Sequence, residues 1–329
     1  MMDRPSTRDN IVQLLGDAAP EAISGEEISR RLQVSRAAVW KQIKVLRSSG
    51  FVIEAVHARG YRLLHRPDAL SATDALRDMD SRILGRSLEI LPQTDSTNLQ
   101  LKKRAEAGAA EGLVLVADHQ LAGRGRLGRR WQSPPGVNLY LSLLIRPDIP
   151  VQQAPQLTFL SAVAVATTLA EVCGLPAEVK WPNDILIDGA KIAGLLNEMD
   201  AETERINYVI LGIGVNLNMT ADQFPRELTY PATSVLLQTG QRVDRPHFLK
   251  LLLERLDVYY GEFLEQGFAP IRSRWEALCP IVNRTVRVGA GDTSRCGVVV
   301  GLESDGALKL QREDGCVERI VAGDVRLVS

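Results

Sequence analysis

The first 66 residues hold the pattern that most restricts the fold of this chain, because two helix-start signals follow each other closely. Residues 24–27 (SGEE) have the spacing of a capping box and predict a helix that ends near Leu32. Ser35 is placed to cap a second helix, in which apolar residues recur at helical spacing from Val39 to Leu46. Helix, short turn and helix together predict a helix-turn-helix unit.

A hairpin signal follows the second helix. Residues 51–56 (FVIEAV) and 61–64 (YRLL) are rich in β-forming side chains, and the turn between them contains Arg59 and Gly60. A helix-turn-helix followed by such a hairpin is typical of a winged helix, which we expect to span residues 1–66.

Charge is unevenly distributed along the chain. Residues 1–66 carry eleven Lys and Arg against seven Asp and Glu, whereas the whole chain carries 39 against 40. A basic segment joined to a mildly acidic remainder is typical of nucleic-acid-binding modules, so we expect the second helix and the wing tip to bind DNA. The alternative is a winged helix that binds protein and has a solvated basic face. The residues expected to contact DNA are Ser35, Arg36, Lys41, Lys44, Arg47 and Arg59.

Beyond residue 66, strand-like and helix-like segments alternate. Several strands are spaced as hairpins, which favours a mixed α+β sheet over a doubly wound one, in a central domain of residues 67–280. The expected strands are Ser87–Leu91, Leu113–Ala117, Leu139–Ile145, Glu178–Trp181, Ile185–Asp188, Ile192–Glu198 and Tyr208–Leu217, and the expected helices are Leu99–Ala107, Ala154–Val172 and Pro246–Gln266. Five short strands punctuated by glycine then predict a small C-terminal β-barrel over residues 281–329. The fold class is therefore multidomain α+β.

Composition excludes several classes of protein. With 45% hydrophobic and 24% charged residues, the chain is typical of globular proteins rather than of disordered or fibrous ones. No uninterrupted apolar run reaches the roughly 18 residues of a membrane span. The four cysteines, at positions 173, 279, 296 and 316, show no CxxC or other metal-ligand spacing. We therefore expect reduced thiols, a cytoplasmic location and no metal site formed by a cluster of side chains.

The stretch 123–131 (GRGRLGRRW) is the most informative part of the central domain. Its glycines allow backbone N–H groups to approach an anion closely, and its arginines offer planar donors to carboxylate and phosphate. It is not a Walker A loop, which requires GxxxxGK followed by Ser or Thr. Because it lies between two predicted strands, we interpret it as a small-molecule phosphate-binding loop rather than as an RG-rich nucleic-acid tail.

Five further motifs, each weak alone, accompany this loop. Residues 94–98 (TDSTN) and 118–120 (DHQ) are polar, and residues 180–184 (KWPND) form a rigid polar turn. Residues 189–194 (GAKIAG) place a lysine at the start of a strand. Residues 212–218 (GIGVNLN) alternate glycine with apolar residues, as expected where a sheet face lies flat against a ligand.

The motifs STN, GRGRxGR, KWPND, KxAG and GIGxN resemble those of the biotin protein ligase family, in family order and over nearly the whole chain. The N-terminal module resembles that of the family's bifunctional members, which also repress the biotin operon. The resemblance implies a class II synthetase-like catalytic domain and an SH3-like C-terminal domain. It also implies two reactions. Biotin and Mg-ATP give biotinyl-5′-AMP and pyrophosphate, and the biotinyl group then passes to a lysine of the biotin carboxyl carrier protein of acetyl-CoA carboxylase.

The resemblance assigns roles to individual residues. The catalytic set would be Lys191, Arg126, Asp184 and Asn183, with Mg2+ bound with ATP near Asp184. Biotin would contact Ser96, Thr97, Asn98, Gln120, Arg124, Arg126, Lys191, Gly194, Gly212 and Gly214. ATP and the adenylate would contact Gly123, Arg124, Arg126, Arg129, Trp131, Asn183, Asn216 and Arg326. The implied partners are the carrier protein, operator DNA and, once the adenylate is bound as corepressor, a second copy of the chain; no membrane is implied.

Two positions depart from the family pattern. Leu127 stands where repressor-type relatives commonly have another loop arginine, so one donor is lost. Residues 223–238 contain no Trp, although some relatives place one over the adenine there, and Phe224 and Tyr230 are the available aromatic residues. Two other functions stay open, namely a lipoate–protein ligase with the same fold and adenylate chemistry, and a ligand-sensing repressor that has lost catalysis.

Overall fold

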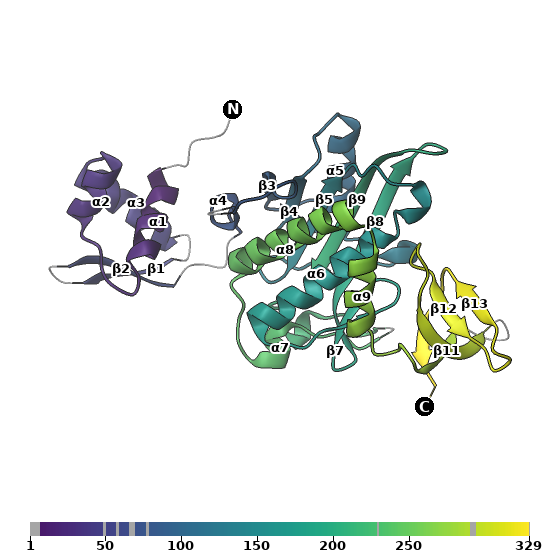
Figure 1. The fold of residues 1–329 in the computed structure, drawn as a ribbon. Coiled ribbons are helices and arrows are strands. Elements are labelled where there is room, and N and C mark those ends of the chain that lie inside the picture. The colour runs from purple at the N-terminus through teal and green to yellow at the C-terminus, as the bar shows by residue number, and fades with distance from the viewer. Residues whose placement is uncertain are drawn as a thin grey trace. The chain divides into compact units, whose positions relative to one another are not determined.

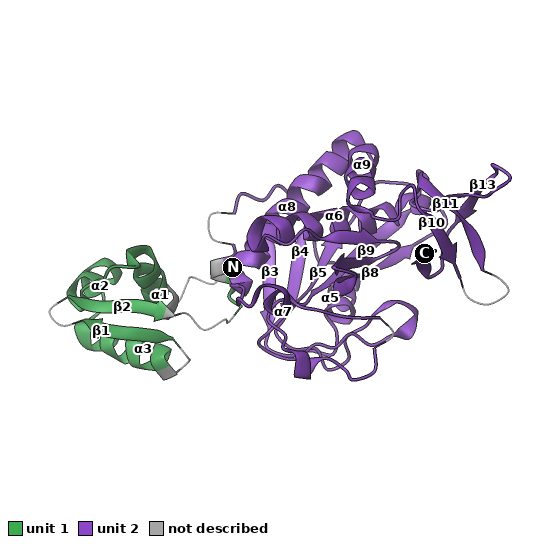
Figure 2. Ribbon diagram, turned by 90° about the horizontal axis from the view of Figure 1, so that it is seen from below, with its two compact units in different colours: residues 1–73 green, residues 74–329 purple. Residues whose placement is uncertain are grey.

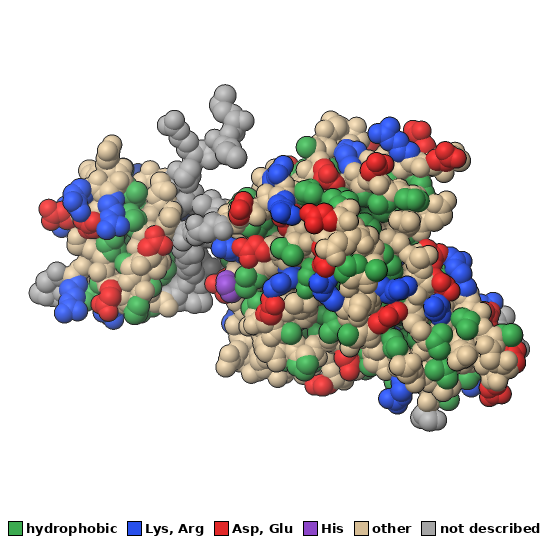
Figure 3. Space-filling view, viewed as in Figure 1, with side chains coloured by type: hydrophobic (Ala, Val, Ile, Leu, Met, Phe, Trp, Pro, Cys, Tyr) green, Lys and Arg blue, Asp and Glu red, His purple; other side chains and the backbone are tan. Residues whose placement is uncertain are grey.

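The structure is a computed structural model of the 329-residue chain and describes residues 7–48, 51–56, 59–65, 70–76, 79–228, 230–289 and 294–328. The chain forms two compact units, Met1–Thr73 and Asp74–Ser329 (Figure 2). Lys, Arg, Asp and Glu side chains are interspersed on the visible face of the larger unit (Figure 3), in keeping with a net charge of −1 for the whole chain.

The N-terminal unit is a winged helix, as predicted. Its elements are α1 (Thr7–Ala18), α2 (Gly25–Leu32), α3 (Arg36–Ser48), β1 (Val52–Val56) and β2 (Gly60–His65). Helix α2 starts where the capping box predicts, since the Glu27 amide donates to Ser24 Oγ at 3.0 Å. Helix α3 buries Val39, Ile43 and Leu46, each 1% exposed, in the core of the unit. Strands β1 and β2 pair antiparallel to form the wing.

A seven-stranded sheet forms the centre of the larger unit (Figure 1). Its strands, in spatial order, are β3 (Ser87–Leu91), β4 (Leu113–Ala117), β5 (Leu139–Ile145), β9 (Ile206–Val215), β8 (Ala190–Ala201), β7 (Asp184–Ile187) and β6 (Glu178–Lys180). The β3–β4 pair is parallel and the other pairs are antiparallel, so the predicted mixed sheet is confirmed. Strand β8 runs seven residues past Gly194, where its pairing with β7 ends.

Helices cover both faces of this sheet. Thr158 of α6 (Gln156–Cys173) accepts from Asn197 of β8, whereas Asn98 of α5 (Thr97–Glu106) donates to the neighbouring Glu198. Because adjacent strand residues point to opposite faces, α5 and α6 lie on opposite sides of the sheet. The remaining helices are α4 (Ala72–Ala75), α7 (Val235–Thr239), α8 (Arg245–Gln266) and α9 (Ala269–Leu278), and α8 and α9 pack on α6.

Helix α6 is the central core helix of this unit. By length and composition, the helical segment Val151–Cys173 is apolar enough to cross a membrane, but 67% of its apolar 18-residue stretch is buried inside the protein. Burial on that scale is typical of the core helix of a globular domain.

The C-terminal residues form a five-stranded antiparallel sheet, which confirms the five short strands predicted there. The order is β13 (Val317–Ile320), β12 (Leu308–Gln311), β11 (Arg295–Leu302), β10 (Thr285–Val288) and β14 (Val325–Leu327). We refer to it as the barrel. Helix α9 was not predicted from the sequence, because only Ile271 and Trp275 are buried along its ten residues and its apolar periodicity is weak.

Candidate active site

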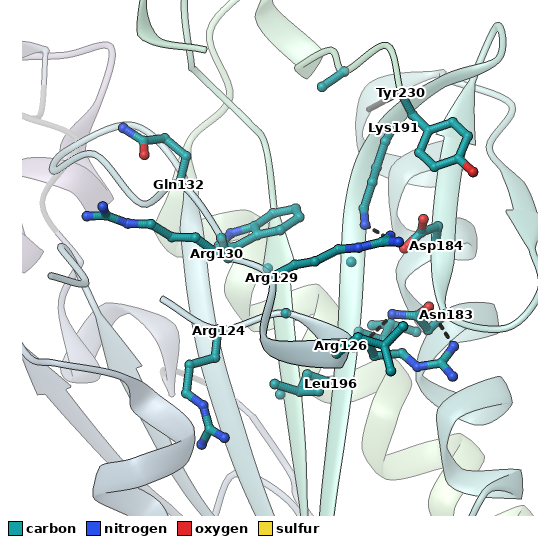
Figure 4. A pocket seen from close by; sticks show the side chains of 18 of the residues that line it. Arg124, Arg126, Arg129, Arg130, Gln132, Asn183, Asp184, Lys191, Leu196 and Tyr230 are labelled. Carbon is teal, nitrogen blue, oxygen red and sulfur yellow. Dashed lines mark hydrogen bonds and ion pairs between the residues drawn. The ribbon is translucent and has the colours of Figure 1, made fainter. Parts of the chain in front are cut away.

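A cavity of about 480 Å³ lies beside β8 and β9, and its wall is completed by the 123–131 loop and the barrel (Figure 4). It brings together most of the residues that the sequence motifs singled out. Those that line it are Ser96, Thr97, Asn98, Gln120, Arg124, Arg126, Arg129, Trp131, Asn183, Asp184, Lys191, Gly194, Gly212, Gly214 and Asn216. Gly123 and Arg326 are not among the lining residues, although the neighbouring Val325 is.

An ion pair forms the polar centre of the cavity. Lys191 Nζ lies 2.5 Å from Asp184 Oδ1, and the two side chains are 26% and 21% exposed. The same ammonium lies 5.4 Å from the centre of the Trp131 ring. Asp184 and Lys191 come from β7 and β8, whose register places Asp184 opposite Gly194. Asp184 of the 180–184 turn and Lys191 of the 189–194 motif are thus held on adjacent strands, where their carboxylate and ammonium can act on one ligand.

Arg126 lies next to this pair. Its Nη1 donates to Asn183 Oδ1 at 3.3 Å, and Asn183 Nδ2 donates to the carbonyl of Leu195 at 2.7 Å. Burial lowers the pKa of the Arg126 guanidinium, and the neighbouring Asp184 and Asp324 partly oppose this shift. A half-buried cation with free donors suits phosphate or carboxylate oxygens.

The inner end of the cavity is a chain of uncharged polar groups. The Thr97 amide donates to Gln120 Oε1 at 2.9 Å, and Gln120 Nε2 donates to Ser133 Oγ at 3.0 Å. Ser142, which is fully buried on β5, lies 2.7 Å from Thr97 Oγ1 and 2.6 Å from Asn98 Oδ1. Paired donors and acceptors in a buried pocket can bind a small amide-like or ureido group by hydrogen bonds.

Glu198 connects this inner end to the 123–131 loop, which we call the arginine loop. Its carboxylate lies 3.0 Å from Arg124 Nη1, and it accepts from Asn98 Nδ2 at 2.8 Å. Figure 4 accordingly shows Arg124 pointing away from Lys191 and Asp184, whereas Arg126 lies beside Asn183. The sequence motifs did not include Glu198, Ser133 or Ser142.

Glycines let the cavity walls pack closely. A Cβ on Gly214 would lie 2.6 Å from Trp131 Nε1, and one on Gly194 would lie 2.9 Å from the same ring. A Cβ on Gly212 would lie 2.3 Å from Asn98 Oδ1. The flat face predicted from the alternating glycines is therefore filled by the Trp131 ring and the Asn98 amide.

The outer end of the cavity is partly apolar and partly formed by the barrel. Phe224 and Tyr230 both line it, and Lys180 Nζ lies 4.2 Å from the centre of the Tyr230 ring. Burial lowers the pKa of the Lys180 ammonium. Arg129 of the loop lies 3.6 Å from Asp324 of the barrel, so loop and barrel meet directly at the cavity edge.

In the winged helix, the predicted DNA-contacting residues differ in what they do. Arg36, Lys41 and Lys44 are exposed along α3, and Arg59 is exposed at the wing. Ser35 Oγ caps α3 by accepting from the Ala38 amide at 3.1 Å. Arg47 donates to the Ile53 carbonyl at 2.9 and 2.7 Å and so fastens α3 to the wing.

Three family models match the chain. The biotin/lipoate A/B protein ligase family matches residues 90–216, an HTH domain matches residues 7–62, and the biotin protein ligase C terminal domain matches residues 281–328. These ranges coincide with the cavity-bearing sheet, the winged helix and the barrel.

Two relatives are similar to this chain along nearly their whole length. The bifunctional ligase/repressor BirA of Bacillus subtilis is 38% identical over 98% of this chain and 99% of its own. The protein of the same name from Escherichia coli is 33% identical over 93% of each chain. Among solved structures, the biotin protein ligase from Aquifex aeolicus in complex with biotin and ATP superposes with a TM-score of 0.62 at 31% identity, covering 74% of this chain and 99% of that one.

Proposed function

Because this chain belongs to the biotin protein ligase family, we propose that its cavity activates biotin with ATP and that its winged helix represses transcription. The observation that carries the proposal is the cavity itself, which gathers a Lys–Asp pair, a half-buried arginine and a polar inner end beside β8 and β9. The substrates are biotin, ATP and a lysine of the biotin carboxyl carrier protein.

The polar inner end suits the ureido ring of biotin. Gln120 and Thr97 supply an amide and a hydroxyl there, and Ser96 and Asn98 lie beside them. A ureido ring needs two acceptors for its N–H groups and donors for its carbonyl, and these side chains offer both. Because the Trp131 ring packs directly against Gly214, the aliphatic tail would then run alongside that ring, towards Lys191.

In the first reaction, a carboxylate oxygen of biotin attacks the α-phosphorus of ATP. The new O–P bond replaces the bond to the β-phosphate, and pyrophosphate leaves with the bonding electrons. We assign Lys191 and Arg126, which lie beside Asp184 and Asn183 in the cavity, to the carboxylate and the α-phosphate, where negative charge accumulates. The reaction needs no covalent enzyme intermediate, so positioning and charge stabilisation account for catalysis.

In the second reaction, the neutral amine of the acceptor lysine attacks the acyl carbon of biotinyl-5′-AMP, and AMP leaves. The acceptor ammonium loses one proton, which Asp184 can accept, to become the nucleophile, and its nitrogen loses a second proton to water as the amide forms. Of the two carboxylates that line the cavity, Asp184 and Asp324, Asp184 is the one that can hold the incoming ammonium, since it already pairs with an ammonium at 2.5 Å.

Mg2+ fits this arrangement as a companion of ATP. In the part of the chain that the structure describes, no group of three or more His, Cys, Asp or Glu side chains is arranged so that it could hold a metal ion by itself. Mg2+ commonly needs only one or two carboxylates beside substrate phosphates and water, and Asp184 with Asn183 can supply oxygen ligands. When bound, Mg2+ would neutralise charge on the phosphates.

Substrate class is tested by offering labelled biotin and labelled lipoate, each with ATP, to biotin carboxyl carrier and lipoyl carrier domains. We expect labelling with biotin alone. Labelling with lipoate alone would replace the biotin assignment by a lipoate–protein ligase. Pyrophosphate release on mixing biotin and ATP with the protein separates a working enzyme from a repressor that has lost catalysis.

For repression, the motivating observation is a winged helix in the same chain as the cavity. We propose that biotinyl-5′-AMP acts as corepressor and that two copies then bind a two-fold symmetric operator. Because repression of biotin genes is useful when biotin is plentiful, the adenylate is the appropriate signal. A mobility shift on DNA upstream of biotin-synthesis genes, with and without biotin plus ATP, tests this. Equal affinity in both conditions would contradict the corepressor role.

The proposed dimer contact is sheet to sheet along β8. Strand β8 pairs with β9 as far as Ala201, but its pairing with β7 stops at Gly194, and no other described strand pairs with that edge. Met199, 44% exposed, lies in this open segment. An unpaired strand edge is a ready surface for a two-fold contact between identical chains.

We also propose a cytoplasmic location, which suits the four free cysteines, Cys173, Cys279, Cys296 and Cys316.

A further inference from the structure

Trp40 is an exposed aromatic residue in the middle of the outer face of α3. Its side chain is 58% exposed, and it is the only aromatic residue among the large apolar side chains exposed in the described ranges. The opposite face of α3 is filled by Val39, Ile43 and Leu46, so the core has no place for it. An exposed tryptophan that does not serve the core of its own domain is a candidate for contact with a partner.

The surroundings of Trp40 are cationic. Lys44 Nζ lies 5.6 Å from the centre of its ring, and Arg36 and Lys41 are exposed on the same face. The sequence of α3, RAAVWKQIKVLRS, contains no Asp or Glu. An aromatic ring surrounded by cations, with no acid on the helix, is complementary to a polyanion that also offers apolar groups.

The major groove of DNA meets both requirements. Its rims are phosphates, and its only apolar group is the C5-methyl of thymine. Helices of helix-turn-helix units contact base edges with residues near their N-terminal end, and Trp40 is the fifth residue of α3. Arg47 is occupied by the Ile53 carbonyl and braces the wing, which leaves Arg36, Lys41 and Lys44 for the phosphates around the aromatic ring.

Building on the proposed repressor function, we propose that Trp40 is a specificity-determining residue that packs on a thymine methyl group in each operator half-site. The flanking cations fix the helix on the backbone and carry little sequence information. Trp40 then favours a thymine at one position of each half-site. The assignment is independent of the active site, because Trp40 lies in the separate N-terminal unit.

The test replaces thymines of the footprinted operator, one at a time, by deoxyuridine, which lacks only the methyl group. Affinity is measured by fluorescence anisotropy in the presence of biotin and ATP. For the wild-type protein we expect one thymine per half-site whose replacement lowers affinity about fourfold, the effect of one buried methyl group. In Trp40→Ala the same replacement should have no effect, whereas Trp40→Phe should keep part of it.

Val52→Ala is the matched control. Val52 is 49% exposed, belongs to the same unit and lies on the wing strand β1. This variant should show the full methyl effect, and all variants should keep the melting temperature of the wild type. Trp40→Ala should also keep its affinity for duplex poly(dG)·poly(dC), because the cations are unchanged and that DNA has no methyl group.

The outcomes separate this inference from the repressor assignment. If the wild-type protein fails to bind the operator region at all, the repressor assignment itself falls. If it binds but every thymine replacement affects wild type and Trp40→Ala equally, the repressor stands and Trp40 does not read a methyl group. If Trp40→Ala changes sedimentation of the DNA-free protein and leaves the methyl effect intact, the ring belongs to a protein contact instead.

Discussion

The neighbours of Lys191 hold its ammonium in place and so explain its proposed role in stabilising the transition state. Asp184 lies 2.5 Å from its ammonium and Trp131 lies under it, so the side chain is oriented before substrate arrives. A preoriented charge need not reorganise as the transition state forms, which is the main source of its catalytic effect.

Lys191→Ala should therefore nearly abolish adenylate formation. The loss of one preorganised transition-state donor typically costs about 3–4 kcal/mol, or roughly 100–1000-fold in rate. Pyrophosphate release at saturating biotin and ATP measures it. Lys102→Ala, which removes a lysine with a 53% exposed side chain on α5, should leave the rate unchanged. A near-normal rate in Lys191→Ala would remove this residue from the chemistry.

Gly212 offers a second test at the residue scale. A Cβ there would lie 2.3 Å from Asn98 Oδ1 and 2.8 Å from the Leu196 carbonyl, so Gly212→Ala must displace the Asn98 amide from the inner end of the cavity. We expect a large rise in the KM for biotin, with a loss of about 1–3 kcal/mol of unfolding free energy from overpacking.

Gly261→Ala is the control for this change. Gly261 lies inside α8, and the nearest atom to its added Cβ would be Arg82 Nη1 at 3.9 Å. This variant should gain about 0.5–1 kcal/mol, because alanine is the better helix former, and biotin KM should not move. An unchanged biotin KM in Gly212→Ala would show that Asn98 does not help to bind the head group.

The sequence revealed those site residues that stand in short motifs of unusual composition, and it did not reveal those that stand alone in a strand. Arg126, Asn183 and Lys191 stand in short motifs with unusual composition, and all three line the cavity. Ser142 and Glu198 stand alone in otherwise apolar or ordinary strands. Their importance comes from the β5–β9–β8 register, which places them beside α5, and no local pattern encodes that register.

At the scale of elements, too, features with a local sequence pattern were predicted and features that depend on strand pairing were not. Strands such as Leu113–Ala117 and Leu139–Ile145 were predicted with the bounds that the structure has, because the first is a continuous apolar run and only Ser142 interrupts the second. Strand β8 extends to Ala201, beyond the predicted Glu198, because its polar end is held by pairing with β9 rather than by its own propensity. Local composition predicts buried strands well and exposed strand ends poorly.

The arginine loop is the element whose conformation matters most to the ligand. Leu127 and Gly128 have positive φ angles of 57° and 72°, and the Leu127 side chain is 85% exposed. Three of its arginines meet the rest of the protein through single polar contacts, of Arg124 with Glu198, Arg126 with Asn183 and Arg129 with Asp324. Such a loop contributes little to the core, so its sequence can be tuned for ligand retention.

Gly128→Val should weaken retention of the adenylate more than it weakens the fold. A Cβ at Gly128 meets no atom within 4 Å, so the change acts through the left-handed backbone alone, at a cost of about 1–3 kcal/mol. We expect a faster adenylate off-rate in stopped-flow measurements. Gly315→Val, at φ 81° with no atom within 4 Å in a barrel turn, imposes the same backbone strain without the ligand effect. Equal off-rates in the two variants would contradict this role of the loop.

At the scale of the whole molecule, the proposed corepressor role requires that a small molecule bound in one unit control DNA binding by the other. The winged-helix region has a net charge of about +4 over residues 1–66, and a module of this size can contact only a few phosphates, so we expect a single copy to bind weakly at physiological salt. Two linked copies gain affinity through effective concentration, without any new contact to DNA. Dimerisation is therefore sufficient as the switch, provided that the adenylate favours it.

Met199→Lys tests this coupling through the open edge of β8. Two-fold symmetry would bring the edges of both copies together, and lysines placed there should repel and raise the dimer dissociation constant at least about tenfold. Sedimentation with a non-hydrolysable adenylate analogue should show a dimer for the wild type at tens of micromolar and mainly monomer for Met199→Lys. Operator affinity should fall as the dimer is lost, while pyrophosphate release stays normal because Met199 does not line the active-site cavity.

Val258→Lys is the control for this change. It places a lysine at a 58% exposed position of α8 and should dimerise as the wild type does. If the wild type stays monomeric with the analogue and operator affinity does not rise, the coupling fails even though the ligase assignment survives.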